Sequence, residues 1–102
     1  MRTEVIGRHI DITDSIRQHA EGKVDKLIRH FGQILQVNFT ITHEESNAEA
    51  PFAAELIIDV EHHEDFVSHS KDADVYAAID QVVNKGVRQL KDHKEKTRDA
   101  KR

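Results

Sequence analysis

The chain has 102 residues, of which 33% are charged and 37% are hydrophobic, and its net charge is −4. It contains no cysteine, which excludes disulfides, thiolate zinc sites and cysteine nucleophiles. No apolar run is long enough to cross a bilayer, and Met1-Arg2-Thr3-Glu4 begins no signal peptide. We therefore expect one soluble, cytoplasmic domain over residues 1–102, with no membrane partner.

The charges are sorted along the chain. Residues 85–102 hold eight of the fifteen Lys and Arg but only three of the nineteen acids, a local charge of +5. Residues 31–70 hold eight acids and no Lys or Arg. A basic element of this kind suits an anionic partner, of which a nucleic acid is the commonest. A solvated basic turn favoured by the helix dipole would give the same pattern and stays open as an alternative.

The first half of the chain predicts a strand, a helix and a second strand. Residues 2–8 form a short strand pattern, and Thr13 stands where the N-cap of a helix is expected. Apolar residues then recur at helical spacing until Gly32. Residues 34–43 alternate between apolar and polar, which indicates a half-buried strand. The buried face of this strand is expected to comprise Leu35, Val37, Phe39 and Ile41.

The second half predicts two more strands and a long helix. Residues 52–60 alternate again and are expected to form a hairpin with the preceding strand, and a further strand follows at 66–71. Either Asp72 or Asp74 caps the last helix, whose apolar stripe ends at Leu90. The order β-α-β-β-β-α predicts an α+β fold, in which two helices pack on one face of a four-stranded sheet as a two-layer sandwich.

Both expected helices separate their charges by face. One flank of the first helix carries basic residues, which at 100° per residue are His19, Lys23, Lys26 and His30. On the last helix, the basic residues that lie away from the apolar stripe are Lys85, Arg88 and Lys91. If the helices lie side by side, these faces merge into one patch that binds phosphates.

Neither catalysis nor metal binding is predicted. The sequence has no glycine-rich phosphate loop and no nucleophile elbow, and a solvated strand face explains Glu55 and Asp59. Residues with metal-ligating side chains gather near one expected turn: His62, His63, Glu64, Asp65 and His69. Adjacent histidines in a strand point to opposite faces, and no HxxxH or HExxH spacing occurs, which favours a solvated turn. We expect no enzyme activity, cofactor, metal or small-molecule substrate.

Two segments resemble a known family. The first is Gly7-Arg8-His9 with Ile12-Thr13-Asp14, followed by a helix that ends in Arg29-His30-Phe31. The second is Asp74-Val75-Tyr76-Ala77-Ala78-Ile79-Asp80, opening a helix that carries Arg88-Gln89-Leu90 and His93-Lys94-Glu95-Lys96. Over essentially its whole length, the chain resembles the short hibernation-promoting factors and ribosome-associated inhibitors of bacteria, also called sigma-54 modulation proteins.

The resemblance implies the same order of elements and a function on the ribosome. Members of this family bind the small ribosomal subunit in the channel that otherwise holds mRNA and tRNA, and they block translation in stationary phase or under stress. Their basic helix faces contact ribosomal RNA phosphates, and no chemical step is involved. Carried over by position, the resemblance implies RNA contacts from Arg8, His9, Lys23, Lys26, Lys85, Arg88, Lys91, Lys94 and Lys96.

Three features depart from the family pattern. The loop at 44–49 is acidic where many relatives are basic, so we expect no RNA contacts from it. Gly86 stands where relatives usually have a larger apolar residue, which predicts a weakened helix or a close approach of its backbone to the sheet. The sequence ends at Arg102, where long members continue into a dimerising domain, so pairing of ribosomes is expected to need a separate dimerising factor.

Two further expectations concern the surface and the C-terminus. The acidic residues Glu44, Glu45 and Glu49 suggest an alternative function, a protein-interaction module that regulates a transcription or stress factor. From about Lys91 the last helix is expected to run on as a polar helix or a frayed tail, and about the last eight residues are expected to form a frayed or disordered basic tail. Off the ribosome we expect a monomer.

Overall fold

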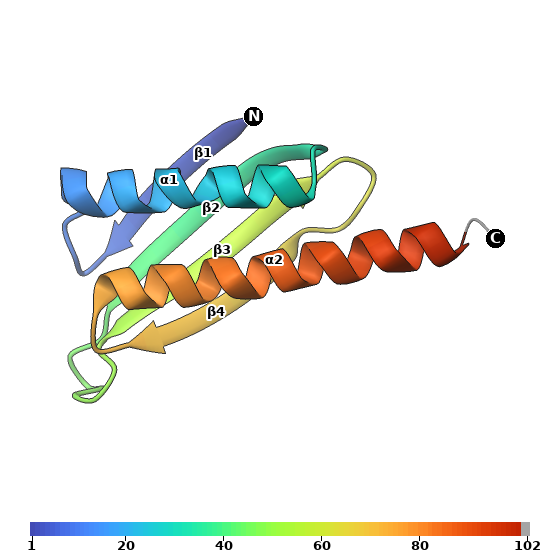
Figure 1. The fold of residues 1–102 in the computed structure, drawn as a ribbon. Coiled ribbons are helices and arrows are strands. Elements are labelled where there is room, and N and C mark those ends of the chain that lie inside the picture. The colour runs from blue at the N-terminus through green and yellow to red at the C-terminus, as the bar shows by residue number, and fades with distance from the viewer. Residues whose placement is uncertain (101–102) are drawn as a thin grey trace.

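The computed structural model describes the backbone of residues 1–100 and the side chains of residues 1–96. The chain forms a four-stranded sheet with two helices on one face (Figure 1). The α+β sandwich predicted from the sequence is therefore confirmed. Its elements are β1 (Arg2–Arg8), α1 (Asp14–His30), β2 (Ile34–His43), β3 (Phe52–Val60), β4 (Phe66–Asp72) and α2 (Val75–Ala100).

The strands lie in the order β1-β2-β3-β4. β1 and β2 are parallel, whereas β2 pairs with β3, and β3 with β4, in antiparallel fashion. Parallel neighbours need a crossover connection, which α1 supplies, and short loops suffice between the antiparallel strands. The two helices run side by side across the same face of the sheet (Figure 1). In the described part of the chain, the opposite face carries no helix.

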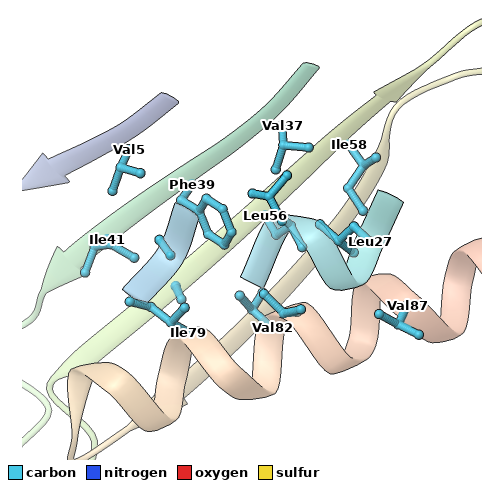
Figure 2. Packing of buried hydrophobic residues seen from close by; sticks show 14 of the residues in the cluster. Val5, Leu27, Val37, Phe39, Ile41, Leu56, Ile58, Ile79, Val82 and Val87 are labelled. Atoms are coloured by element: carbon cyan, nitrogen blue, oxygen red, sulfur yellow. The ribbon is translucent and has the colours of Figure 1, made fainter. Parts of the chain in front are cut away.

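The core lies between the sheet and the two helices (Figure 2). The period-two alternation of β2 and β3 points every second side chain toward the helices, so that Phe39, Leu56 and Ile58 are fully buried. The apolar stripes of the helices complete the core, with Leu27 from α1 and Ile79 from α2. Burial of this apolar surface is the main force that fixes both helices on the sheet.

The start of β2 differs from the predicted alternation. Leu35 was expected on the buried face, but it is 51% exposed, and Ile34 is buried in its place. The register between β2 and β3 shifts between Ile34 and Gln36, which marks a β-bulge. A bulge inserts one residue on one strand and offsets the in-out alternation, so the prediction for Leu35 was wrong.

At Gly86 the backbone of α2 approaches the side chains of the sheet closely. A Cβ atom at this position would stand 2.9 Å from Leu56 Cδ2 and 3.1 Å from Ile58 Cδ1. Of the two consequences predicted for this glycine, the close approach of the helix backbone to the sheet is confirmed. The missing side chain lets the Leu56 and Ile58 side chains fill the space beneath α2.

Side-chain caps begin both helices. Thr13 Oγ1 accepts a hydrogen bond from the Ile16 amide at 3.1 Å, as predicted. At the start of α2, Asp74 Oδ1 accepts from the Tyr76 amide at 3.2 Å, while Asp72 Oδ1 accepts from the Asp74 amide at 2.9 Å. Asp74 is therefore the capping residue, and Asp72 fixes the turn that precedes it.

α2 continues well past the sheet. Leu90 is fully buried, yet the helix extends to Ala100 (Figure 1). The backbone of the expected tail belongs to this helix as far as residue 100. Residues 101 and 102 of that tail lie outside the described residues. Within residues 1–100, neither helix combines the length and hydropathy that a bilayer crossing requires.

Candidate nucleic-acid interface

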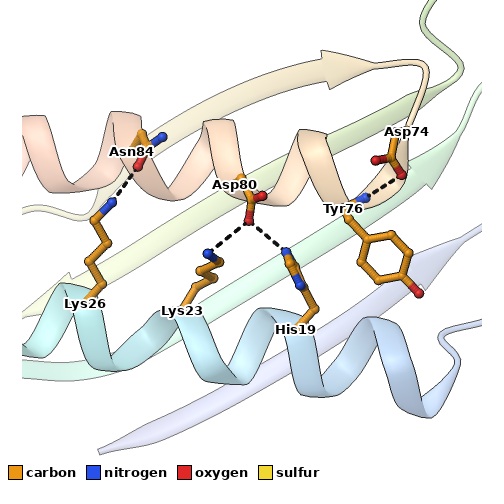
Figure 3. Close-up of polar contacts among 7 residues, drawn as sticks. All are labelled: His19, Lys23, Lys26, Asp74, Tyr76, Asp80 and Asn84. Atoms are coloured by element: carbon orange, nitrogen blue, oxygen red, sulfur yellow. Dashed lines mark hydrogen bonds and ion pairs between the residues drawn. The ribbon is translucent and has the colours of Figure 1, made fainter.

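Polar side chains of α1 and α2 meet where the two helices lie side by side. This line of contacts, here called the groove, runs from His19 and Asp80 to the hollow beside Lys94. Asp80 of α2 accepts a hydrogen bond from His19 Nε2 at 2.7 Å, and Lys23 Nζ lies 3.4 Å from the same oxygen (Figure 3). His19 and Lys23 are four residues apart, so one helical turn brings both to a single carboxylate. This first part of the groove is therefore an ion-paired clamp between the helices.

The clamp alters the acidity of Asp80. Partial burial acts to raise the pKa of this carboxyl, but the hydrogen bonds and charges of His19 and Lys23 outweigh burial and hold the pKa below its ordinary value. The Tyr76 ring meets the His19 ring edge-on, with centroids 5.1 Å apart. Tyr76 thereby supports the imidazole that bridges the two helices, which is a structural role.

One turn further along the groove, the helices are connected by a hydrogen bond to a neutral side chain instead of an ion pair. Lys26 Nζ donates a hydrogen bond to Asn84 Oδ1 at 2.8 Å (Figure 3). Asn84 follows Asp80 by one turn of α2, but its side chain is a neutral amide. Lys26 is consequently held in place by a neutral partner, and this contact does not compensate its positive charge.

The last part of the groove is a basic hollow. The residues that line it come from the end of α1 and from the middle of α2: Arg29, His30, Lys91, Lys94 and Glu95. Among residues 1–96, no ion pair joins any of these five side chains to a partner. Basic groups from two helices thus face a common, solvent-filled space.

Lys85 lies on the other flank of α2, next to the free edge of the sheet. Its Nζ donates a hydrogen bond to the His69 carbonyl at 2.5 Å, and Gln89 Nε2 donates to the Val67 carbonyl at 2.9 Å. Lys85 and Gln89 are four residues apart, and both cover outward-facing carbonyls of β4 that would otherwise lack a strand partner. The structure therefore does not bring Lys85 together with the groove.

Lys96 lies on this same flank of α2, where it lines a hollow with His63 and Phe66. Arg88 is exposed on the outer surface of α2, between the two flanks. The basic residues predicted on α2 therefore spread around the helix, and only Lys91 and Lys94 line the hollow with α1.

Arg8 and His9 lie away from the helix groove. Arg8 is on the open face of the sheet, where it lines a shallow hollow with Glu55 and Lys71. His9 follows in a left-handed backbone conformation, with φ of 58°, beside residues of the loop between β2 and β3. The two residues at the end of β1 that the family resemblance assigned to RNA contacts thus lie on a surface separate from the groove.

Comparison with known proteins identifies the family. A family model described as "Sigma 54 modulation protein / S30EA ribosomal protein" matches residues 3–98, nearly the whole chain. The chain belongs to this family. A ribosome hibernation promoting factor of Azotobacter vinelandii is 36% identical over 101 residues, which cover 94% of this chain and 85% of the relative. The ribosome hibernation promoting factor of Escherichia coli is 30% identical over 96 residues, with 94% and 96% covered.

Solved structures agree with this family assignment. The crystal structure of the N-terminal domain of Thermus thermophilus Protein Y has a TM-score of 0.76 and 30% identity, and the match covers 88% of this chain and 94% of that one. A ribosomal subunit interface protein from Coxiella burnetii superposes with a TM-score of 0.82 over 93% of this chain and 99% of that one. At 17% identity, the Coxiella protein supports the fold alone.

Arg29 was not among the residues predicted to contact RNA, nor was His30. Helical rotation had placed His30 on the basic flank, which is a usable signal for it. Arg29 lies about 100° away from His30 on a helical wheel, so its place in the hollow follows from the position of α2 rather than from α1 alone. Packing between the helices is the information that the sequence pattern lacks.

Some acids of this family member have a basic neighbour on or beside the open face of the sheet. Glu44 pairs with Lys71 at 3.1 Å, and Glu55 lies 3.7 Å from His69 Nδ1. Of the three acids that suggested a protein-interaction module, Glu44 is therefore ion-paired to a lysine. Among the residues described, no three His, Asp or Glu side chains are grouped closely enough to hold a metal ion.

Proposed function

We propose that this protein is a ribosome hibernation factor that binds the small ribosomal subunit through ribosomal RNA. The observation that most supports this function is the groove between α1 and α2, in which basic side chains of both helices face one open space. Relatives at 36% and 30% identity carry the name ribosome hibernation promoting factor. The site of action is the cytoplasm, where ribosomes translate.

The proposed contacts occupy several parts of the surface. The groove supplies Lys23, Lys26, Lys91 and Lys94. Arg88 lies beside it on the exposed side of α2. Outside the groove, the proposed contacts are Arg8, His9, Lys85 and Lys96. A rough, curved RNA surface would be needed to reach all of these positions together.

The proposed mechanism is steric competition supported by electrostatics. Each Lys or Arg that neutralises a phosphate releases counterions, so the affinity for RNA falls as salt rises. Phosphates carry no sequence information, and recognition therefore depends on the shape of the folded RNA. A domain that occupies the channel of mRNA and tRNA excludes both, and translation stops without any chemical step.

A cell-free translation assay tests this function. Added protein is expected to inhibit translation, and ribosomes loaded beforehand with mRNA and initiator tRNA should resist inhibition. The double substitution Lys91→Glu with Lys94→Glu should remove inhibition while circular dichroism shows an unchanged fold, because both side chains are exposed. Undiminished translation at saturating wild-type protein would reject the proposal.

A further inference from the structure

We infer that the groove has two functionally distinct parts: a clamp at Asp80 that holds the helices together, and a phosphate-binding subsite formed by Arg29, His30, Lys91 and Lys94. The inference rests on the proposed function and refines it, because it names the part of the groove that takes the RNA backbone. It adds Arg29 and His30 to the binding surface, and it assigns Lys23 mainly to holding the helices.

The clamp already satisfies the charge of Lys23. Its ammonium group lies 3.4 Å from Asp80 Oδ1, and its side chain is 39% exposed. An approaching phosphate would have to compete with that carboxylate or lie beside it, and two negative groups repel one another. Neutralising Lys23 therefore removes little of the attraction for RNA.

The subsite has the opposite arrangement. Its two walls present Arg29 and His30 from α1 and Lys91 and Lys94 from α2, and Glu95 is the one acid that lines it among the described residues. No ion pair within residues 1–96 compensates the charges of Arg29, Lys91 or Lys94. Like charges facing each other cost free energy in the unbound protein, and an anion between them removes that cost.

The chemistry of the walls favours a phosphodiester as the anion. Arg29 offers a planar fork of donors that matches two phosphate oxygens, and the two lysines act as point charges from the other side. Lys26 stands about one helical turn before Arg29 on α1 and bonds across to Asn84 of α2. Successive phosphates of one RNA strand can thus be contacted by Lys26 and then by the subsite.

Co-sedimentation with purified small ribosomal subunits over a salt series tests this division. In the double variant Arg29→Gln with Lys91→Gln, the slope of log affinity against log salt should decrease by about 1.4–1.8, or 0.7–0.9 for each lost phosphate contact. Lys23→Gln should change the slope by less than half of one contact. Arg17→Gln is the matched control, because Arg17 is an exposed arginine of α1 that lies about 200° around the helix from His19.

A second measurement on the same variants separates the two roles. The clamp variant Lys23→Gln should lower the thermal midpoint of unfolding, whereas Arg29→Gln with Lys91→Gln should leave it unchanged or raise it by relieving repulsion. Steep, salt-dependent wild-type binding with an unchanged slope in the double variant would overturn the subsite but keep the proposed function. An equal loss of slope in Arg17→Gln would also overturn it. Absence of wild-type binding would overturn the function and the subsite together.

Discussion

Asp80 of α2 and His19 of α1 are joined by a hydrogen bond of 2.7 Å although they lie 61 positions apart in the sequence. This contact, together with Lys23, links the two helices at the start of the groove. Basic residues follow further along both helices, whose packing is fixed by the core beneath them. The proposed binding surface is composed of two helices, so its shape depends on the contacts between them.

Removal of the clamp carboxylate should destabilise the fold. Asp80→Asn loses the charge that attracts His19 and Lys23, and all three side chains are partly exposed, so we expect a loss of about 1 kcal/mol in the free energy of unfolding. Urea denaturation measures this loss in the free energy of unfolding. Asp92→Asn, an exposed site on the same helix, is the control and should have little effect. Equal midpoints for Asp80→Asn and wild type would show that the clamp does not stabilise the helices.

Two glycines in helices should respond oppositely to the same substitution. Gly22→Ala should stabilise the protein by roughly 0.5–1 kcal/mol, because a Cβ at this exposed position of α1 meets no atom within 4 Å and alanine favours helix. Gly86→Ala gains the same propensity but pushes against Leu56 and Ile58, which are fully buried. Overpacking costs about 1–3 kcal/mol. Gly86→Ala should therefore be less stable than Gly22→Ala in urea denaturation, and a common gain for both would contradict the close approach of α2.

Stability should also fall in mild acid because of His93. Its ring contacts His63, Phe31 and Phe66 at centroid distances of 4.4, 5.7 and 5.4 Å. Burial lowers the pKa of His93, and the nearby His63 lowers it further. The unfolded chain therefore binds a proton at His93 more readily than the folded protein does.

The sign of the effect follows from that difference. Stabilisation by neutral His93 is complete above the ordinary histidine pKa of about 6.5 and is lost as pH falls from there through the lowered pKa of the folded state. His93→Phe keeps an aromatic ring at this position and cannot titrate. Between pH 7.5 and pH 5, wild type should lose more unfolding free energy than His93→Phe, as measured by urea midpoints at both values. An equal loss in the two proteins would show that His93 does not cause the loss of stability in mild acid.

Local patterns predicted most of the fold, because each strand and helix has to bury one face. The alternation of β3 and the helical spacing up to Leu27 needed no tertiary information. Leu35 was placed on the wrong face because a bulge is a local irregularity of pairing, and it does not alter the alternating sequence. The sequence could not decide whether Asp72 or Asp74 caps α2, because both are aspartates. The hydrogen bonds in the structure identify Asp74 as the cap.

The arrangement of the proposed binding surface was less predictable than the fold. Lys23 and Lys26 were identified from one helix alone, and their partners Asp80 and Asn84 come from the other. Lys85 is a basic residue of the kind that contacts phosphates, but its Nζ donates a hydrogen bond to a carbonyl of the edge strand β4. Charge and spacing show which residues are basic and exposed. Which of them share a space depends on how the helices pack, and that is decided by the core beneath them.

The most direct test of the central claim is the binding of purified protein to purified small ribosomal subunits, measured by co-sedimentation from low to high salt. Binding through RNA phosphates should give retention at low salt, a steep loss of retention as salt rises, and displacement by mRNA with initiator tRNA. Absence of retention at every salt concentration would contradict ribosome binding. Retention that is indifferent to salt would contradict phosphate contacts as the source of affinity.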